Sequence, residues 1–365
     1  MFYYFFVQSV NHVFFFENLF KYISFRSGGA LLTAFVLFLI LGKQFISFIK
    51  MLQVNGQPIR DSGLIPSNHI LKSGTPTMGG LLIVFVFIIS VLLWSDLDNK
   101  FVPIILLLST VFCGIGFYDD FLKIKKKNAY ALSKRFRIIA EILAALVAVF
   151  FIMNSLPNGL NTSIFVPFSK NLVVDYGLWL FLPFGVFVII GSANAVNITD
   201  GLDGLSSLMS INVATVLLIL SYILGRFDYS MYLHFPNIVG ASELSIVMAS
   251  LIGSLLGFLW FNSKPAQIFM GDTGSLAIGA VLAGIAVILK VEFIFAIAAF
   301  VLIVETLSSL LQIIYINFFH KKILLMAPLH HHFEMKGVKE EKIVMRFWIV
   351  SIICSLIALS TLKIR

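Results

Sequence analysis

Carboxylate side chains stand where long apolar segments of the chain end. The clearest pair is Asp119 and Asp120, which close the apolar run from Phe101 to Tyr118. Adjacent residues lie about 100° apart around a helix, so we expect one carboxylate to face a metal or a nucleophile and the other to hold a lysine or the helix. Lys123, about one turn later, is placed to pair with them. Because acidic groups at a membrane exit are costly without a partner, the pattern indicates a metal–phosphate site.

A second acidic group lies in the segment 194–205, which has two Asp-Gly steps and no Lys or Arg. Because this segment has no cation of its own, its carboxylates are expected to face a cation from elsewhere. The EF-hand pattern is absent, which argues against a calcium loop. A spacing of three residues keeps four polar side chains near one face of a turn, namely Asn194, Asn197, Asp200 and Asp203.

Asp272 lies between glycines just before an apolar segment, where a carboxylate serves either as a helix N-cap or as a metal ligand. Its local pattern favours a cap, but its expected position on the same side as the other acids favours the metal. Phe269, three residues earlier, either stacks on a base or faces lipid. We expect Asp119, Asp200, Asp203 and Asp272 to converge around one divalent ion in a cavity open to the cell interior.

Lys72 precedes a segment rich in Gly and Pro that ends at Gly79 and Gly80. Such a segment turns the chain and lets backbone approach a ligand, while the lysine offers a cation for phosphate or a base edge. The alternative is a helix start with close packing at the two glycines. A Walker loop is excluded, because the lysine precedes the glycines and no GKS or GKT follows.

Three consecutive histidines, His330, His331 and His332, carry another candidate site. They cannot all bind one metal from a regular helix, so zinc is not expected. Donors to a diphosphate or sugar, or an internal hydrogen-bond hub, fit better. Glu305 is the one ionisable group expected inside a span, with Gln312 two turns along the same face. A functional role and a structural interhelical bond are equally compatible with it.

The composition of the whole chain indicates which kind of structural element positions these residues. The 365 residues are 59% hydrophobic and 12% charged, with a mean hydropathy of +0.99, which predicts an all-α polytopic membrane protein. No linker rich in Pro, Gly or Ser divides it, so residues 1–365 are expected to form one domain. We expect the aromatic N-terminal segment to be interfacial rather than a cleaved signal, and Cys113 and Cys354 to be core residues. About ten helices are predicted, at 27–49, 77–95, 101–118, 138–155, 174–193, 205–224, 242–262, 275–290, 292–316 and 343–362.

The basic residues predict the orientation of these helices. If the N-terminus is outside, 17 of the 26 Lys and Arg residues fall in the inner segments and 8 in the outer ones, with Lys43 left unassigned near a span end. This bias predicts that both termini are periplasmic and that five connecting segments are cytoplasmic. All the polar groups above then share the cytoplasmic side. The sequence pI of about 9.4 follows from this orientation, and no nucleic acid is needed to explain it.

Six motifs together resemble the phospho-N-acetylmuramoyl-pentapeptide-transferase family, part of the polyprenyl-phosphate N-acetylhexosamine-1-phosphate transferase superfamily. The resemblance runs in order from about residue 50 to the C-terminus. It is carried by KSGTPTMGG at 72–80, YDDFLK at 118–123, NAVNITDGLDGL at 194–205, FMGDTGSLA at 269–277, VETLS at 304–308 and APLHHHFE at 327–334.

The resemblance implies a ten-helix bacterial inner-membrane enzyme of peptidoglycan synthesis, usually a homodimer, with an active site formed by cytoplasmic loops. It implies transfer of phospho-MurNAc-pentapeptide from UDP-MurNAc-pentapeptide to undecaprenyl phosphate, with Mg2+, giving lipid I and UMP. Asp119, Asp120 and Asp272 match the catalytic acids, and Asp272 matches the metal ligand. The nucleotide-side positions are Lys72, Asn197, Asp200, Gly201, Leu202, Asp203 and Phe269, and the histidine motif that sets this enzyme apart from relatives using smaller UDP-sugars is His330, His331 and His332.

Two departures from the family pattern stand out. Asp61 does not clearly occupy the usual acidic position, and Arg137 stands where a lysine is common. An arginine cannot act as a proton donor, although it still holds phosphate. Lys72 or Lys123 is expected to neutralise phosphate charge, and Asp119 to act on the lipid phosphate.

Several alternatives remain open from the sequence. A covalent aspartyl-phosphate intermediate is the other chemical route. A relative that transfers phospho-GlcNAc is the alternative enzyme. A secondary transporter is a different class, but transporters place charges near the midplane, whereas these acids stand at span ends. A purely structural scaffold would leave the tandem Asp-Gly steps without a cause.

Overall fold

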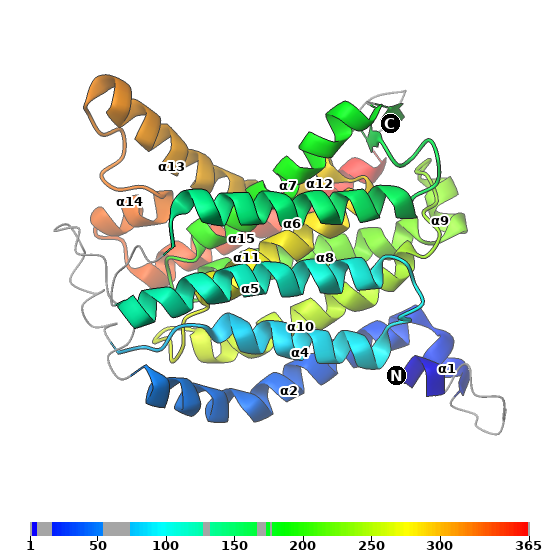
Figure 1. Cartoon of the computed structure of the whole chain (residues 1–365), viewed down its shortest axis with the longest axis horizontal. Helices are drawn as coiled ribbons and strands as arrows, with labels where there is room; N and C mark the ends of the chain where they lie inside the picture. Colours follow the sequence, from blue (N-terminus) through cyan, green and yellow to red (C-terminus); the bar gives the residue numbers. More distant parts are fainter. Residues whose placement is uncertain are drawn as a thin grey trace.

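The computed structural model describes residues 2–5, 17–53, 74–126, 132–165, 173–175 and 177–363. Within these ranges the chain is an all-α polytopic membrane protein (Figure 1). Lys72, predicted to bind substrate, lies outside the described residues, as does Asp61.

The described residues contain nine helices long and apolar enough to cross a membrane. A tenth apolar helix, α4, has 16 residues and is shorter than the hydrocarbon core of a bilayer. The prediction of about ten helices is therefore confirmed. The ten are α2 (Ile23–Leu52), α4 (Gly79–Trp94), α5 (Val102–Lys126), α6 (Lys134–Ser155), α7 (Gly177–Thr199), α8 (Leu205–Leu224), α10 (Leu244–Asn262), α11 (Gly271–Leu289), α13 (Phe300–Phe319) and α15 (Glu340–Ser360).

Three predicted spans were wrong in their extent. Helix α5 ends at Lys126 instead of 118 and so contains Asp119, Asp120 and Lys123, and α7 ends at Thr199 instead of 193 and so contains Asn194 and Asn197. The segment expected to form a single helix over 292–316 is divided into α12 (Glu292–Ala298) and α13, which begins at Phe300. Both pieces are apolar, so hydropathy alone does not reveal the break at Ala299. The remaining short elements are α1 (Glu17–Lys21), α9 (Phe227–Tyr232), η2 (Ala241–Glu243), α14 (Leu329–Met335), η3 (Thr361–Lys363) and an antiparallel pair, β1 (Ser163–Phe165) and β2 (Val173–Asp175), with Ile164 opposite Val174.

The centre of the bundle is α11, of which 94% of the most apolar stretch is buried inside the protein. A helix that is apolar on all sides belongs at the core. Helices α4, α5, α7 and α8 surround it, whereas α2, α13 and α15 are buried over only 28% of their most apolar stretches and form the periphery. In Figure 1, α13 runs outward from the bundle at the end where α14 lies.

Glycines permit the closest helix contacts around the start of α11. A Cβ atom on Gly80 of α4 would lie 2.1 Å from the Gly274 nitrogen, and one on Gly116 of α5 would lie 2.2 Å from the Asp272 carbonyl oxygen. The backbones therefore meet where the acidic motifs of α5 and α11 lie. Both described ends of the chain lie at the opposite end of the bundle from α14 (Figure 1).

Candidate functional site

The last turns of α5 and the first turn of α11 bring the acidic motifs together. Asp119, Asp120 and Lys123 project from α5, and Asp272 is the second residue of α11. Gly271 precedes it with a positive φ of 75°, and a Cβ there would lie 2.5 Å from Asp120 Oδ2. Glycine is thus required at this turn, because both the backbone conformation and the space exclude a side chain.

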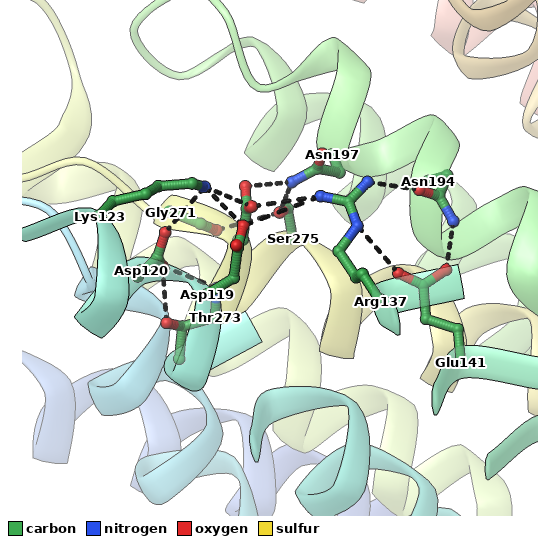
Figure 2. A network of polar contacts seen from close by, with 11 residues as sticks. Asp119, Asp120, Lys123, Arg137, Glu141, Asn194, Asn197, Gly271, Thr273 and Ser275 are labelled. Carbon is green, nitrogen blue, oxygen red and sulfur yellow. Dashed lines mark hydrogen bonds and ion pairs between the residues drawn. The ribbon is translucent and has the colours of Figure 1, made fainter. Parts of the chain in front are cut away.

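Lys123 is the centre of the acidic cluster (Figure 2). Its Nζ lies 2.6 Å from Asp272 Oδ2, 2.8 Å from Asp119 Oδ2 and 3.5 Å from Asp120 Oδ1. All four side chains are largely buried, so these charges are poorly screened by water. The expected pairing of Lys123 with the acids is confirmed.

The two adjacent aspartates share Lys123 but differ in their other partners, as their spacing around the helix predicts. Asp120 is fully buried, and its Oδ2 accepts hydrogen bonds from the Thr273 amide at 3.0 Å and the Thr273 hydroxyl at 2.7 Å. It therefore fixes the first turn of α11 against α5. Asp119 shares Lys123 with Asp272, on the side that carries the remaining polar groups (Figure 2).

A second cation, Arg137 at the start of α6, reaches the same cluster. Its Nη1 lies 3.4 Å from Asp272 Oδ2, and its Nη2 donates to Asn194 Oδ1 at 3.1 Å. Glu141, one turn further along α6, lies 3.4 Å from Arg137 Nε and accepts a hydrogen bond of 2.7 Å from Asn194 Nδ2. Asn194 and Glu141 thus hold the Arg137 guanidinium in place, with its Nη1 directed at Asp272.

Glu141 is a residue that sequence analysis missed. It lies inside the span predicted at 138–155 and is fully buried, so the prediction that Glu305 is the one ionisable group inside a span was wrong. The signal was present in the sequence, because Glu141 follows Arg137 by four residues on one helix face.

The last turn of α7 and the turn that follows it contribute polar residues to two places. Asn197 Nδ2 donates to Asp272 Oδ1 at 2.6 Å and to Ser275 Oγ at 2.8 Å. Asp200 instead accepts a hydrogen bond of 2.6 Å from Ser206, and Asp203 accepts one of 3.2 Å from the Ala266 amide. Burial raises the pKa of Asp200 to about 7, in spite of the Ser206 hydrogen bond.

The convergence of four aspartates around one divalent ion stays a prediction, because the direct contacts divide them into two pairs while the charges of Asp272, Asp120 and Asp203 all help to raise the pKa of Asp200. Asp119 and Asp272 meet at Lys123, while Asp200 and Asp203 face Ser206 and the segment after α10. In the described part of the chain, no group of three or more His, Cys, Asp or Glu side chains is placed to hold a metal.

The three histidines have three separate partners. His330 Nδ1 lies 3.0 Å from Glu305 Oε2, with both side chains fully buried, and its Nε2 lies against Gly201, where a Cβ would be only 2.3 Å away. His331 Nδ1 is 2.8 Å from Glu334 Oε2. His332 Nδ1 accepts the Leu325 amide at 3.1 Å. Each histidine ring thus makes an internal hydrogen bond, which agrees with one of the two expectations, and contact with a diphosphate or sugar stays a prediction.

The remaining candidates line the neighbouring turns. Leu202 is buried. Phe269 is half-buried, and its backbone pairs with Pro76 and Gly79, which joins the Gly- and Pro-rich segment before α4 to the start of α11. Close packing at Gly79 and Gly80, the alternative considered for that segment, is observed.

The chemistry of the donor set fits Mg2+ bound together with phosphate. Mg2+ prefers carboxylate oxygens, takes only one or two of them, and completes its shell with water and phosphate oxygens. Asp272, with 16% of its side chain exposed, and Asp119 supply two adjacent carboxylates. Among the residues that the structure describes, four carboxylates, those of Asp119, Asp120, Asp272 and Glu141, pair with two cations, Lys123 and Arg137. This excess of negative charge favours a divalent cation over a free anion.

Comparisons with known proteins agree on one family. Residues 102–290 match the family described as Glycosyl transferase family 4, and residues 72–84 match phospho-N-acetylmuramoyl-pentapeptide-transferase signature 1. A phospho-N-acetylmuramoyl-pentapeptide-transferase from Granulibacter bethesdensis is 46% identical over 353 residues, covering 96% of this chain and 97% of the relative. Proteins of the same name from Pelagibacter ubique (45% over 351 residues, 96% of each chain) and Desulfotalea psychrophila (47% over 349 residues, 95% of this chain and 96% of the relative) are equally similar.

Proposed function

Because the chain belongs to the phospho-N-acetylmuramoyl-pentapeptide-transferase family, we propose that it transfers phospho-MurNAc-pentapeptide from UDP-MurNAc-pentapeptide to undecaprenyl phosphate. The products are lipid I and UMP, and Mg2+ is the cofactor. The observation that carries this proposal is the cluster of Asp119, Lys123, Arg137 and Asp272, in which carboxylates for a metal lie beside cations for phosphate.

The reaction requires this combination of charges. A UDP-sugar and a lipid phosphate are both anions, so attack of one on the other needs positive charge at the diphosphate. Mg2+ bound by Asp272, with Asp119 beside it, would supply charge neutralisation and polarise the transferred phosphoryl group. Lys123 and Arg137 are within reach of the same space and hold phosphate oxygens. Asp119 is the residue that orients the lipid phosphate or accepts its proton.

The location of the cluster also suits the two substrates. A polyprenyl phosphate keeps its chain in the bilayer, whereas a UDP-sugar is water-soluble, so the reaction belongs at the membrane surface. Asp272 begins α11, and Asp119 lies in the last two turns of α5, so both stand at helix ends. We propose that this end faces the cytoplasm of a bacterial inner membrane, that both termini are periplasmic, and that the enzyme is a homodimer.

A related phospho-GlcNAc transferase would differ from the proposed enzyme in the UDP-sugar that it uses. The test uses purified protein in detergent with Mg2+ and undecaprenyl phosphate, and compares UDP-MurNAc-pentapeptide with UDP-GlcNAc by UMP release and by isolation of the lipid product. We expect release with the first substrate and little with the second. Equal or preferred use of UDP-GlcNAc would overturn the assignment, and gradient-driven uptake into vesicles without any lipid-linked product would favour a transporter.

The direct and covalent routes are separated by isotope exchange. Labelled UMP is incubated with UDP-MurNAc-pentapeptide and enzyme in the absence of lipid acceptor. A covalent aspartyl-phosphate intermediate predicts label in the UDP-sugar. Direct attack by the lipid phosphate predicts none.

A further inference from the structure

Three segments far apart in the sequence meet at the first residue of α15. Glu340 Oε1 accepts a hydrogen bond of 2.9 Å from the backbone amide of Asp203. Its other oxygen, Oε2, lies 3.2 Å from Lys264 Nζ. The residue is only 3% exposed. A single buried carboxylate thus ties the turn between α7 and α8 to the segment between α10 and α11.

The Asp203 turn is held from a second direction as well. Asp203 Oδ2 accepts the Ala266 amide at 3.2 Å, and Asn262 Oδ1 accepts the Gly204 amide at 2.9 Å. Asn262 also donates to the Ile268 carbonyl at 2.8 Å, next to Phe269. The position of Asp203 relative to Phe269 is therefore set by a small number of hydrogen bonds, of which the one from Glu340 comes from outside both segments.

Lys264 remains charged beside Glu340. Desolvation lowers the pKa of this lysine, but the hydrogen bonds to Glu341 and Glu340 outweigh that effect and raise it. The ion pair is half-exposed on the lysine side, where 32% of the side chain is accessible, and almost fully buried on the glutamate side, at 2%. A buried carboxylate with a charged partner and a backbone donor has a fixed orientation, which suits a support for another residue.

From these contacts we propose that Glu340 is a positioning residue for binding of the uridine nucleotide part of the donor substrate, acting through the Asp203 backbone. The proposal rests on the proposed function, because it takes Asp203 and Phe269 as nucleotide-side residues. Glu340 itself need not touch the substrate. Its effect is to keep the Asp203 carboxylate at a fixed place opposite the segment that carries Phe269.

The test compares four variants in the purified, detergent-solubilised enzyme. Glu340→Ala removes the contacts with the Asp203 amide and with Lys264, and Glu340→Asp keeps the charge but withdraws the carboxylate by one methylene from the Asp203 amide. Glu340→Gln keeps an oxygen that accepts this amide. Glu341→Gln is the matched control, because Glu341 is the adjacent residue, is 58% exposed in its side chain, and contacts the same lysine at 3.0 Å. For each, KM and kcat are measured for UDP-MurNAc-pentapeptide and, separately, for the lipid acceptor.

We expect Glu340→Ala and Glu340→Asp to raise KM for the UDP-sugar about tenfold, since a buried amide loses its acceptor. KM for the lipid acceptor should change less than about twofold by comparison. Glu340→Gln should restore KM for the UDP-sugar to near the control value. If Glu340→Ala does not accumulate as folded protein, the contrast between Asp and Gln decides the question.

Two results would overturn the inference, and they differ from failure of the proposed function. One is an unchanged KM for the UDP-sugar in Glu340→Asp and Glu340→Ala. The other is an equal loss of kcat with both substrates in all three Glu340 variants, which a merely structural role predicts. A wild-type enzyme that makes no lipid-linked product with the UDP-sugar would instead overturn the proposed function.

Discussion

Gly116 offers the sharpest test of the helix packing that builds the site. A methyl group at this position would lie 2.2 Å from the Asp272 carbonyl oxygen and 2.6 Å from the Thr273 nitrogen. Ordinary van der Waals contact begins at 3.4 Å, so the first turn of α11 must move by 1.2 Å relative to α5. The atoms concerned are backbone, which cannot rotate away as a side chain does.

That displacement falls on the residues that carry the proposed chemistry. Asp272 would move away from Lys123, now 2.6 Å from it, and Thr273 from Asp120. A misplacement of about 1 Å at a reacting centre costs on the order of 100-fold in rate. We expect Gly116→Ala to lower kcat for lipid-linked product formation by about this factor, with about 1–3 kcal/mol lost from the free energy of unfolding through overpacking.

The matched control is Gly114→Ala on the same helix. Gly114 is exposed, and a Cβ there has no neighbour within 4 Å, so this substitution should leave activity unchanged while slightly favouring the helix. The assay is UMP release with UDP-MurNAc-pentapeptide and undecaprenyl phosphate, together with the melting temperature in detergent. If Gly116→Ala retained activity within about twofold of Gly114→Ala, the close contact between α5 and α11 would not be what fixes the site.

Three further changes test the site itself. Asp272→Asn should abolish Mg2+-dependent turnover while the protein still inserts into the membrane, and near-normal activity would remove this residue from the metal ligands. Arg137→Lys should lower kcat/KM about tenfold, because one ammonium cannot contact Asp272 and Glu141 together. In the Arg137→Lys background, Glu141→Gln should have little additional effect on kcat/KM, whereas full additivity in a double-mutant cycle would show that the two residues act separately. Burial raises the pKa of Asp200 to about 7 from an ordinary value of 3.8. Between these values the folded state binds more protons than the unfolded state, so the free energy of unfolding falls as pH rises. Asp200→Asn should therefore reduce the decrease in melting temperature from about pH 5 to pH 8 in metal-free buffer, and a profile identical to that of the wild type would contradict the pKa assignment.

Hydropathy was sufficient to predict the class of protein and the approximate course of its helices, because membrane burial requires long apolar segments whatever their packing. It failed at Ala299, where two helices with similar apolar content are separated by one residue. A break of this kind depends on contacts with other helices, which no local window contains.

The candidate site, like the fold, could be predicted from the sequence only in part. The neighbouring positions of Asp119, Asp120 and Lys123 on one helix follow from spacing, and the structure brings Asp272 to them. Spacing alone could not show that Asp200 and Asp203 face other partners, since three-residue periodicity describes one turn and not the side chains packed around it. Glu141 was hidden for a related reason, because a single acid in an apolar run is noticed only when its partner Arg137 is placed beside it.

The long separation between Asp120 and Thr273 has a consequence for biosynthesis. The hydrogen-bonded atoms of this pair belong to residues 153 positions apart, so α5 enters the membrane long before its partner has been translated. Until then Asp120 lacks its native hydrogen-bond donors, and an unpaired acid near the end of an apolar helix destabilises a partly assembled bundle. We expect truncated chains that end before α11 to be degraded faster than the complete protein. Membrane proteases would then remove chains that lack Asp272 and so could not bind the two substrates.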